Sequence, residues 1–314
     1  RRQILDSLWQ RINFKPFENG EVASYGKGTV LISEELCSGL DFLKINREKL
    51  TDLGLKFVRR KLEEGRYYYL VNHTAKKIED FVSLQTEGKT AVLMSPEQGT
   101  IGRAKTKYKQ GKTEVAISLL PGQSMIVHIT NQEADDLPLW KYEATAPKMI
   151  DITRDWNLSF KSGGPVLPAD VELTALKPWT AIEGEAFSNF SGQGVYESDF
   201  TLDKINGNSK YILSLGKVLE SAKVWINDKE VGYAFSIPFR LDISEFVKEG
   251  ENKVKVEVAN LMANHVRYLD RNEVKWRNYH EINFVNIDYQ PFDASGWEVM
   301  PSGLSGPVQI EIHD

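Results

Sequence analysis

The sequence predicts a mainly β protein: a small antiparallel β-sandwich, then a larger C-terminal β-sandwich of jelly-roll type, with a short α/β segment before both. Three observations predict this class. Helical periodicity of apolar residues is confined to the start of the chain, alternating apolar and polar residues dominate from about residue 53, and turn-forming residues separate the alternating runs. Because period-two alternation marks strands with one buried face, most of the chain is expected to form sheets.

Length and charge limit the possible classes of protein. The chain has 314 residues, and single cores stop growing at roughly 250 to 300 residues, so two or three domains are expected. A net charge of -5 and a pI near 5.7 provide no basic stripe for a nucleic-acid partner. No apolar run reaches the length of a membrane span, so no membrane insertion is expected. The single cysteine, Cys37, excludes an internal disulfide and a multi-cysteine metal site.

The first part, residues 1–52, is expected to be the α/β remnant of a preceding domain. Residues 4–12 have helical spacing, residues 29–32 form a short apolar run, and Ser33 is placed to cap a following helix. The residues expected on the buried face of that helix are Leu36, Leu40 and Leu43. A strand that leads so directly into a helix is typical of the last β-α unit of an open α/β sheet. Since its other strands are missing and the chain begins with arginine, we expect a piece of a longer protein.

The second part, residues 53–146, is predicted to form the small antiparallel β-sandwich. In its last strand Met125, Val127 and Ile129 are expected to face one way, because side chains alternate along a strand. A linker at residues 132–147, with acidic residues and prolines, ends this part. The predicted strands are residues 66–71, 81–84, 90–94, 114–119 and 125–129.

The third part, residues 147–314, has the strongest alternation. Val254, Val256 and Val258 alternate with charged residues, as in a half-buried antiparallel strand. Regular spacing of such strands favours a jelly-roll sandwich. Further strands are predicted at residues 196–202, 210–215, 222–226 and 307–312, with turns at 206–208, 227–229 and 249–251.

Three segments of this part carry a family resemblance: SGQGVYESDFTL from Ser191, LGKVLESAKVWINDKEVGYAFSIPFRLDIS from Leu215, and EGENKVKVEVANLMANHVRYLD from Glu249. In this order they resemble the galactose-binding-like domain of large glycoside hydrolases. The second segment corresponds to a hairpin of that domain, where Asn227-Asp228 stands in place of the usual Asn-Gly.

Four segments resemble bacterial α-L-rhamnosidase-like glycoside hydrolases: residues 260–284, which contain NHVRYLDRNEVKW, then VMPSGLSGPVQIEI from Val299, GKGTVLISEEL from Gly26 and KFVRRKLEEGRYYYLVN from Lys56. This resemblance implies a non-catalytic accessory region of an enzyme that acts on rhamnose-containing polysaccharide. It also implies that the catalytic barrel precedes Arg1 in the parent chain and that the partners are carbohydrate and that barrel. The usual export of the family implies a periplasmic, cell-surface or secreted location.

The candidate carbohydrate-binding residues of the third part are Asn264, Arg267, Asp270 and Trp276, which fall in a long connection between predicted strands. Amide, guanidinium and carboxylate groups could hydrogen-bond sugar hydroxyls, while the indole offers a stacking face. The structural alternative is an ion-paired loop with Trp276 as its apolar anchor. The same connection holds Glu273, His280, Glu281 and Asp288.

Two interpretations apply to each of three tryptophans: the ring stacks on a sugar, or it packs in the protein core. These residues are Trp179, Trp225 and Trp297. Trp179 is retained as a candidate sugar-binding residue. Trp225 lies out of phase with Val224 and Ile226, so it is expected to point outward or toward a partner layer.

No cofactor is predicted. The five histidines lack zinc-ligand spacing, and Ca²⁺ ligands at Asp135-Asp136 or the turn at Asn206 lack the periodic loop of an EF-hand. Most acidic residues fall on strand surfaces or in turns, so no catalytic residue is assigned. Two alternatives stay open: a stand-alone carbohydrate-binding or adhesion module, and a catalytic fragment that uses Asp270 or Glu273.

Overall fold

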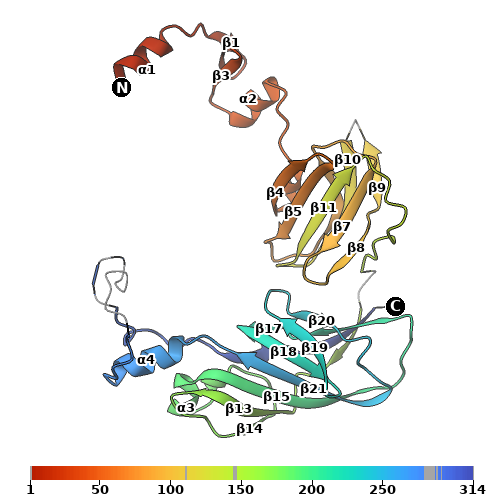
Figure 1. Ribbon diagram of the computed structural model, residues 1–314, viewed down its shortest axis with the longest axis vertical. Helices are drawn as coiled ribbons and strands as arrows, with labels where there is room; N and C mark the ends of the chain where they lie inside the picture. Colours follow the sequence, from red (N-terminus) through yellow and green to blue (C-terminus); the bar gives the residue numbers. More distant parts are fainter. Residues whose placement is uncertain are drawn as a thin grey trace. The chain divides into compact units, whose positions relative to one another are not determined.

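The structure is a computed structural model that describes residues 2–109, 112–143, 147–278, 287, 289–290 and 292–313. It confirms a mainly β protein built from antiparallel sheets (Figure 1). The chain divides into two compact units. The N-terminal unit comprises Arg1–Thr74, Ile78–Leu119 and Ser124–Trp140, and the C-terminal unit comprises Ala75–Lys77, Leu120–Gln123 and Lys141–Asp314. The main division, at Trp140, lies in the segment that the sequence identifies as a linker.

The start of the N-terminal unit is a small α/β region. Its strands form one antiparallel sheet in the order β1-β2-β3. The strand expected at residues 29–32 is β3, and it pairs with β2 in an antiparallel hairpin. Among the described residues it belongs to no parallel sheet. The elements are α1 (Arg2–Trp9), β1 (Lys15–Phe17), β2 (Gly20–Tyr25), β3 (Gly28–Ser33), α2 (Leu36–Phe42) and the 3-10 helix η1 (Lys49–Leu53).

Three expectations for this region are wrong. The N-cap residue of α2 is Glu35, not Ser33, and it has no side-chain cap. The hydroxyl of Ser33 lies outside the helix and donates to the carbonyl oxygens of Asn19 and Glu35. Leu36 is exposed, since the short hairpin offers too little apolar surface to cover the whole helix. The helical spacing at residues 4–12 also predicts a buried apolar stripe that includes Leu8 and Trp9, but both side chains are exposed in α1.

The rest of the N-terminal unit is the predicted small sandwich. A five-stranded sheet has the order β4-β5-β11-β7-β8, and a three-stranded sheet has the order β6-β10-β9. In β11 the side chains of Met125, Val127 and Ile129 are all buried, which confirms the predicted face. The strands are β4 (Leu55–Leu62), β5 (Gly65–Asn72), β6 (Ile78–Leu84), β7 (Thr90–Ser95), β8 (Thr100–Arg103), β9 (Thr106–Lys109), β10 (Lys112–Leu119) and β11 (Ser124–Thr130).

The C-terminal unit is a larger β-sandwich. Its sheets have the orders β14-β13-β15-β21-β18-β19, β12-β23-β16-β20 and β17-β22. The strands are β12 (Lys148–Asp151), β13 (Trp156–Gly164), β14 (Val171–Leu173), β15 (Ser191–Leu202), β16 (Lys210–Ser214), β17 (Lys217–Leu219), β18 (Ser221–Ile226), β19 (Lys229–Ala234), β20 (Arg240–Asp242), β21 (Gly250–Ala259), β22 (Gly303–Gly306) and β23 (Gln309–His313). The helices are η2 (Trp179–Ala181), α3 (Glu185–Asn189) and α4 (Ala263–Arg271).

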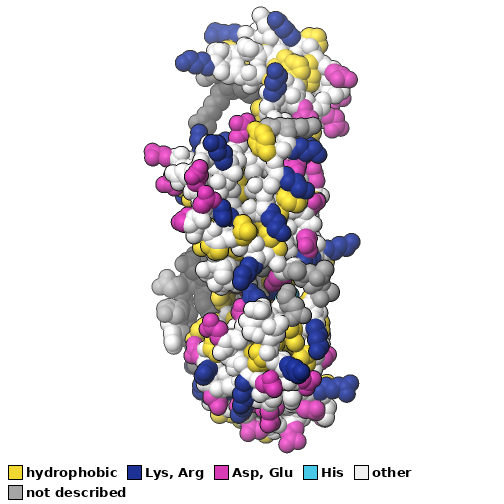
Figure 2. All heavy atoms as spheres, turned by 90° about the vertical axis from the view of Figure 1, so that its right-hand side faces the viewer, with side chains coloured by type: hydrophobic (Ala, Val, Ile, Leu, Met, Phe, Trp, Pro, Cys, Tyr) yellow, Lys and Arg dark blue, Asp and Glu magenta, His cyan; other side chains and the backbone are white. Residues whose placement is uncertain are grey.

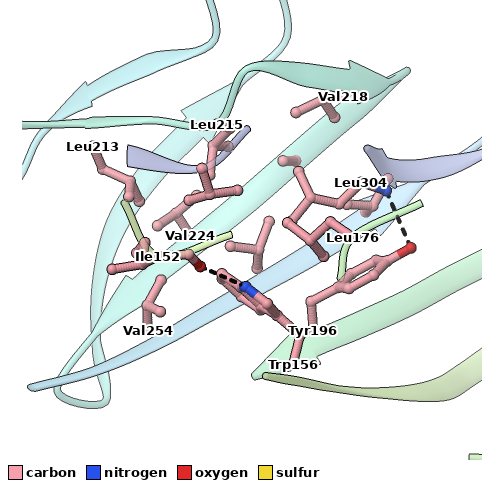
Figure 3. Close-up of a cluster of buried hydrophobic side chains, with 14 of the residues drawn as sticks. Ile152, Trp156, Leu176, Tyr196, Leu213, Leu215, Val218, Val224, Val254 and Leu304 are labelled. Atoms are coloured by element: carbon pink, nitrogen blue, oxygen red, sulfur yellow. Dashed lines mark hydrogen bonds between the residues drawn. The ribbon is translucent and has the colours of Figure 1, made fainter. Parts of the chain in front are cut away.

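The core of the C-terminal unit lies between its two large sheets (Figure 3). Apolar side chains from both sheets meet there, among them Leu213 and Val254, and two polar groups within the core are satisfied. The indole nitrogen of Trp156 donates to the carbonyl oxygen of Ile152 at 2.7 Å, and the hydroxyl of Tyr196 accepts from the backbone nitrogen of Leu304 at 3.1 Å. Such pairing lets large aromatic side chains be buried without an unmet hydrogen bond.

Candidate functional site

Three of the predicted sugar-binding residues lie on helix α4, not in an irregular connection between strands. The sequence does not predict this helix, because its most buried side chains, Asn264 and Arg267, are polar. Asn264, Arg267 and Asp270 recur at three-residue spacing, which places them on neighbouring positions of the helix surface. All three bind the segment at residues 294–302, so α4 fixes the return of the chain toward β22.

The contacts of Asn264 and Arg267 are internal. The side-chain amide of Asn264 donates to the carbonyl oxygen of Met300 and accepts from the Met300 backbone nitrogen, at 2.9 and 2.8 Å. The guanidinium of Arg267 donates to the carbonyl oxygen of Trp297 at 2.8 Å and to Oδ1 of Asn189 at 3.2 Å. Burial lowers the pKa of Arg267, and the positive charge of Arg271 lowers it further.

Asp270 is the centre of a hydrogen-bonded cluster. Its Oδ1 accepts from the indole nitrogen of Trp276 at 2.7 Å, both oxygens accept from the Arg277 guanidinium at 3.0 Å, and Oδ2 accepts from the Ala294 backbone nitrogen at 2.8 Å. Burial by itself would raise the pKa of Asp270, but these donors outweigh it and hold that pKa below the usual value. An ionised carboxylate already bound to several donors has no proton to give to a glycosidic oxygen.

The indole of Trp276 belongs to a small aromatic group next to this cluster. Phe292 meets Trp276 and Trp297 edge to face, with ring centroids 6.1 and 5.6 Å apart. The guanidinium of Arg277 lies 5.5 Å from the rings of Trp276 and Phe292. Trp297 is 42% exposed, so it offers aromatic surface to solvent at this end of the unit.

Of two other tryptophans, one is buried in the core and the other lies on the outer surface of a sheet. Trp179 is fully buried, and Phe160 and Phe190 meet its ring edge to face, which leaves no ring face open to a sugar. Trp225 points out of the six-stranded sheet as its phase predicts, and Lys223 and Lys255 lie over its ring at 5.0 and 4.3 Å. Of the other residues noted in this connection, Glu273 is exposed, and His280, Glu281 and Asp288 lie outside the described residues.

A buried ion cluster elsewhere in the C-terminal unit brings two carboxylates together. Arg240 donates to Glu143 at 3.2 and 3.3 Å and forms a short ion pair with Glu311, whose Oε2 lies 3.2 Å from Nε2 of His313. Burial opposes the charge of Arg240, but the two carboxylates outweigh it and raise its pKa. Both carboxylates pair with the one guanidinium, so each is held by a cation and neither is placed as the free acid or base of a hydrolase.

Sequence reasoning missed an open cleft at one end of the small sandwich. Its volume is about 640 Å³, and its walls come from the ends of β4, β5, β10 and β11 and the turn after β6. The polar side chains that line it are Asn46, Lys61, Glu63, Glu64, Arg66, Gln85, Thr86, Glu87, Lys112, Thr130, Asn131 and Gln132. They come from separate turns and strand ends, so no contiguous motif could have indicated them.

The described residues give no sign of a metal centre or a membrane helix. No group of three His, Cys, Asp or Glu side chains in this part of the chain is placed to hold a metal ion. None of its helices has both the length and the apolar character that crossing a membrane requires. On the face shown in Figure 2, basic and acidic side chains are interspersed and form no large region of one sign.

Comparisons with known proteins agree with this architecture. Residues 128–282 match the family model described as "Glycosyl hydrolases family 2, sugar binding domain". The chain is 27% identical over 325 aligned residues to a protein of Formosa agariphila that is provisionally assigned as a beta-glucuronidase. That alignment covers 95% of this chain and 26% of the relative. The family match fits a carbohydrate-binding accessory region of a glycosidase.

A solved structure also matches nearly the whole chain. The rhamnosidase from Novosphingobium sp. PP1Y superimposes with a TM-score of 0.66 at 25% sequence identity, over 93% of this chain and 27% of the rhamnosidase. The chain therefore spans about a quarter of the length of the proteins that it matches.

Proposed function

We propose that this chain is a non-catalytic, carbohydrate-binding accessory region of a glycoside hydrolase that acts on rhamnose-containing polysaccharide. The observation that carries the proposal is the similarity to the rhamnosidase, which extends over both units of this chain. The sugar-binding family match supports the carbohydrate part of the proposal independently. Catalysis then belongs to a barrel domain of the parent chain, which we expect to be exported to the periplasm or the cell surface.

The chemistry of the buried carboxylates supports a non-catalytic role. A glycosidase needs one carboxyl group that carries a proton and a second one across the cleft, roughly 5 to 9 Å away. Glu48 accepts from Arg59, Tyr68 and the backbone nitrogen of Gln85, and Asp270 is equally occupied. Donors already hold these carboxylates, so neither is free to attack or to protonate a sugar.

In the C-terminal unit, the geometry divides the predicted residues into two groups. The polar atoms of Asn264, Arg267 and Asp270 are used inside the protein, so these residues hold the segment at 294–302 in place. Trp297 and Arg277 remain partly exposed beside them and are proposed to contact the sugar, by stacking and by hydrogen bonding. Trp276 anchors that surface through its bond to Asp270.

Binding and turnover assays of the chain test the proposal. The chain should bind rhamnose-containing polysaccharide in affinity electrophoresis, and Trp297→Ala should weaken that binding about tenfold, a loss of roughly 1.4 kcal/mol. The matched control Trp9→Ala, which removes an exposed tryptophan of the N-terminal unit, should bind like the wild type. Hydrolysis of aryl rhamnosides and aryl glucuronides should be absent.

Other outcomes separate the alternatives. Turnover that disappears in Asp270→Asn or Glu273→Gln would show that the fragment itself is catalytic. Firm glycan binding by a chain whose gene encodes no hydrolase domain would support a stand-alone binding or adhesion module. A parent enzyme that cleaves aryl glucuronides but no rhamnosides would refute the rhamnose part of the proposal.

A further inference from the structure

We infer that the cleft of the N-terminal unit is a second saccharide site, one that takes a neutral oligosaccharide. This cleft, called the sandwich-end cleft below, is lined by the residues named above around β4, β5, β10 and β11. Most of its lining precedes residue 128, where the sugar-binding family match begins, so that match does not assign it. The choice of a saccharide rests on the proposed function; the position and the neutral character of the ligand rest on the cleft itself.

The size and lining of the cleft suit a ligand rich in hydroxyl groups. A volume of about 640 Å³ lies within the range of small-ligand sites, roughly 300 to 1,000 Å³. Such sites are mostly apolar, whereas here only Leu62 and Ile129 add apolar side chains to a lining of amides, hydroxyls and charges. Apolar ligands would leave those polar groups without partners, but sugar hydroxyls both donate and accept.

The polar groups of the lining are available to a ligand. Among the described residues, the side chains of Lys61, Glu64, Glu87, Lys112 and Asn131 take part in no ion pair or side-chain hydrogen bond. Charged groups that face one cleft without pairing to one another can reorient toward a bound molecule. A hydroxyl-rich ligand can therefore form hydrogen bonds with these side chains.

Charge balance decides between a neutral and an acidic saccharide. The lining contains three cations, Lys61, Arg66 and Lys112, and three anions, Glu63, Glu64 and Glu87. Their formal charges cancel, so the cleft produces no net field that would attract a uronate or a sulfated sugar.

Gln85 provides a second, independent observation. Its backbone is fixed, because the nitrogen donates to Glu48 at 2.9 Å and the oxygen accepts from Arg66 at 3.2 Å. Gln85 lines the cleft, and its side-chain Nε2 is buried and has no hydrogen-bond partner in the part of the chain that the structure describes. An unpaired buried donor is unfavourable and rare in folded proteins, and a ligand oxygen against this wall would satisfy it after a small rotation of the amide.

An adjoining cleft lies next to the sandwich-end cleft. It contains two lysines, Lys89 and Lys107, so the charge balance described above applies to the sandwich-end cleft alone. The adjoining cleft has a volume of about 400 Å³, and it shares Glu87 and Asn131 with the sandwich-end cleft. It is lined by Tyr108, whose side chain is 71% exposed and so leaves its ring open for stacking on the C–H face of a sugar. Two clefts that share a wall fit consecutive units of an oligosaccharide better than a single sugar.

NMR titration of the full chain tests the inference. The probes are neutral gluco-, galacto- and rhamno-oligosaccharides of four to six units, with oligogalacturonate as the acidic counterpart. At least one neutral probe should shift backbone amide signals of the sandwich-end cleft in a saturable way and bind more tightly than oligogalacturonate. Lys61→Ala and Tyr108→Ala should each weaken binding several-fold, while Lys56→Ala, an exposed lysine at the other end of β4, should not.

Gln85→Leu separates a binding role from a structural one. It removes an unpaired buried donor and leaves the backbone bonds in place, so the thermal midpoint should stay the same or rise while affinity falls about tenfold. Affinity that falls only together with the thermal midpoint would contradict the inference. Absence of binding by every neutral probe, tighter binding of oligogalacturonate, or shifts confined to residues 141–313 would overturn it. If the shifts were confined to residues 141–313, the inference about the cleft would fail but the proposed function would stand. If the cleft bound a saccharide but the parent enzyme did not cleave rhamnosides, the inference would stand and the rhamnose part of the proposed function would fail.

Discussion

Arg240 shows how one buried charge can depend on its partners. Its side chain is 8% exposed and bridges Glu143 and Glu311. Arg240→Met would leave two carboxylates facing each other without a cation, so the C-terminal unit should lose about 3–5 kcal/mol of unfolding free energy, measured by urea denaturation. Arg47→Met breaks the exposed pair with Asp52 and should cause no measurable change. Equal effects of the two substitutions would contradict this account, whereas partial recovery in Arg240→Met with Glu311→Leu would support it.

The residue scale also includes a pH effect at Asp270. The pKa of this group is lower in the folded protein than its ordinary value of 3.8, so its stabilising contribution is fully present above pH 3.8 and is lost as pH falls through the folded pKa. Asp270→Asn should cost about 2 kcal/mol or more at neutral pH, because charged hydrogen bonds are lost, and it should flatten the acid limb of stability against pH. Circular dichroism during urea unfolding from pH 7 to pH 2 measures both. An unchanged acid limb in the variant would show that Asp270 titrates normally.

At the scale of elements, the hairpin between β18 and β19 offers a direct test. Its two turn residues, Asn227 and Asp228, have φ angles of 52° and 63°, in the left-handed region that a type I′ turn requires. Asp tolerates this region less well than Gly, so Asp228→Gly should stabilise the C-terminal unit by about 0.5–1 kcal/mol. Asn208→Gly is the matched control, because Asn208 does not have a positive φ. A gain in the control and none in Asp228→Gly would refute the argument, and both are measured by thermal unfolding.

The elements also show what the sequence could and could not predict. Strands such as β11 and β21 were predictable, because one buried face imposes a period of two on the side chains. Helix α4 was not predicted, because the side chains that it buries, Asn264 and Arg267, are polar. The position of Trp179 was ambiguous, since an aromatic ring suits a core and a sugar platform equally well. The sandwich-end cleft depends on five separate chain segments meeting in space, which local patterns do not encode.

At the scale of the whole molecule, the two units have separate cores, so we expect them to unfold in separate transitions. Leu70 in the N-terminal unit and Leu213 in the C-terminal unit are both completely buried. Leu→Ala at such sites leaves a cavity and typically costs about 2–5 kcal/mol. Leu70→Ala should therefore move one urea transition and leave the other unchanged, and Leu213→Ala should do the opposite. Hydrogen exchange followed by mass spectrometry assigns each transition to its unit. If each substitution instead shifted both transitions equally, the chain would be one cooperative body, and ligand binding in either unit would then stabilise the other.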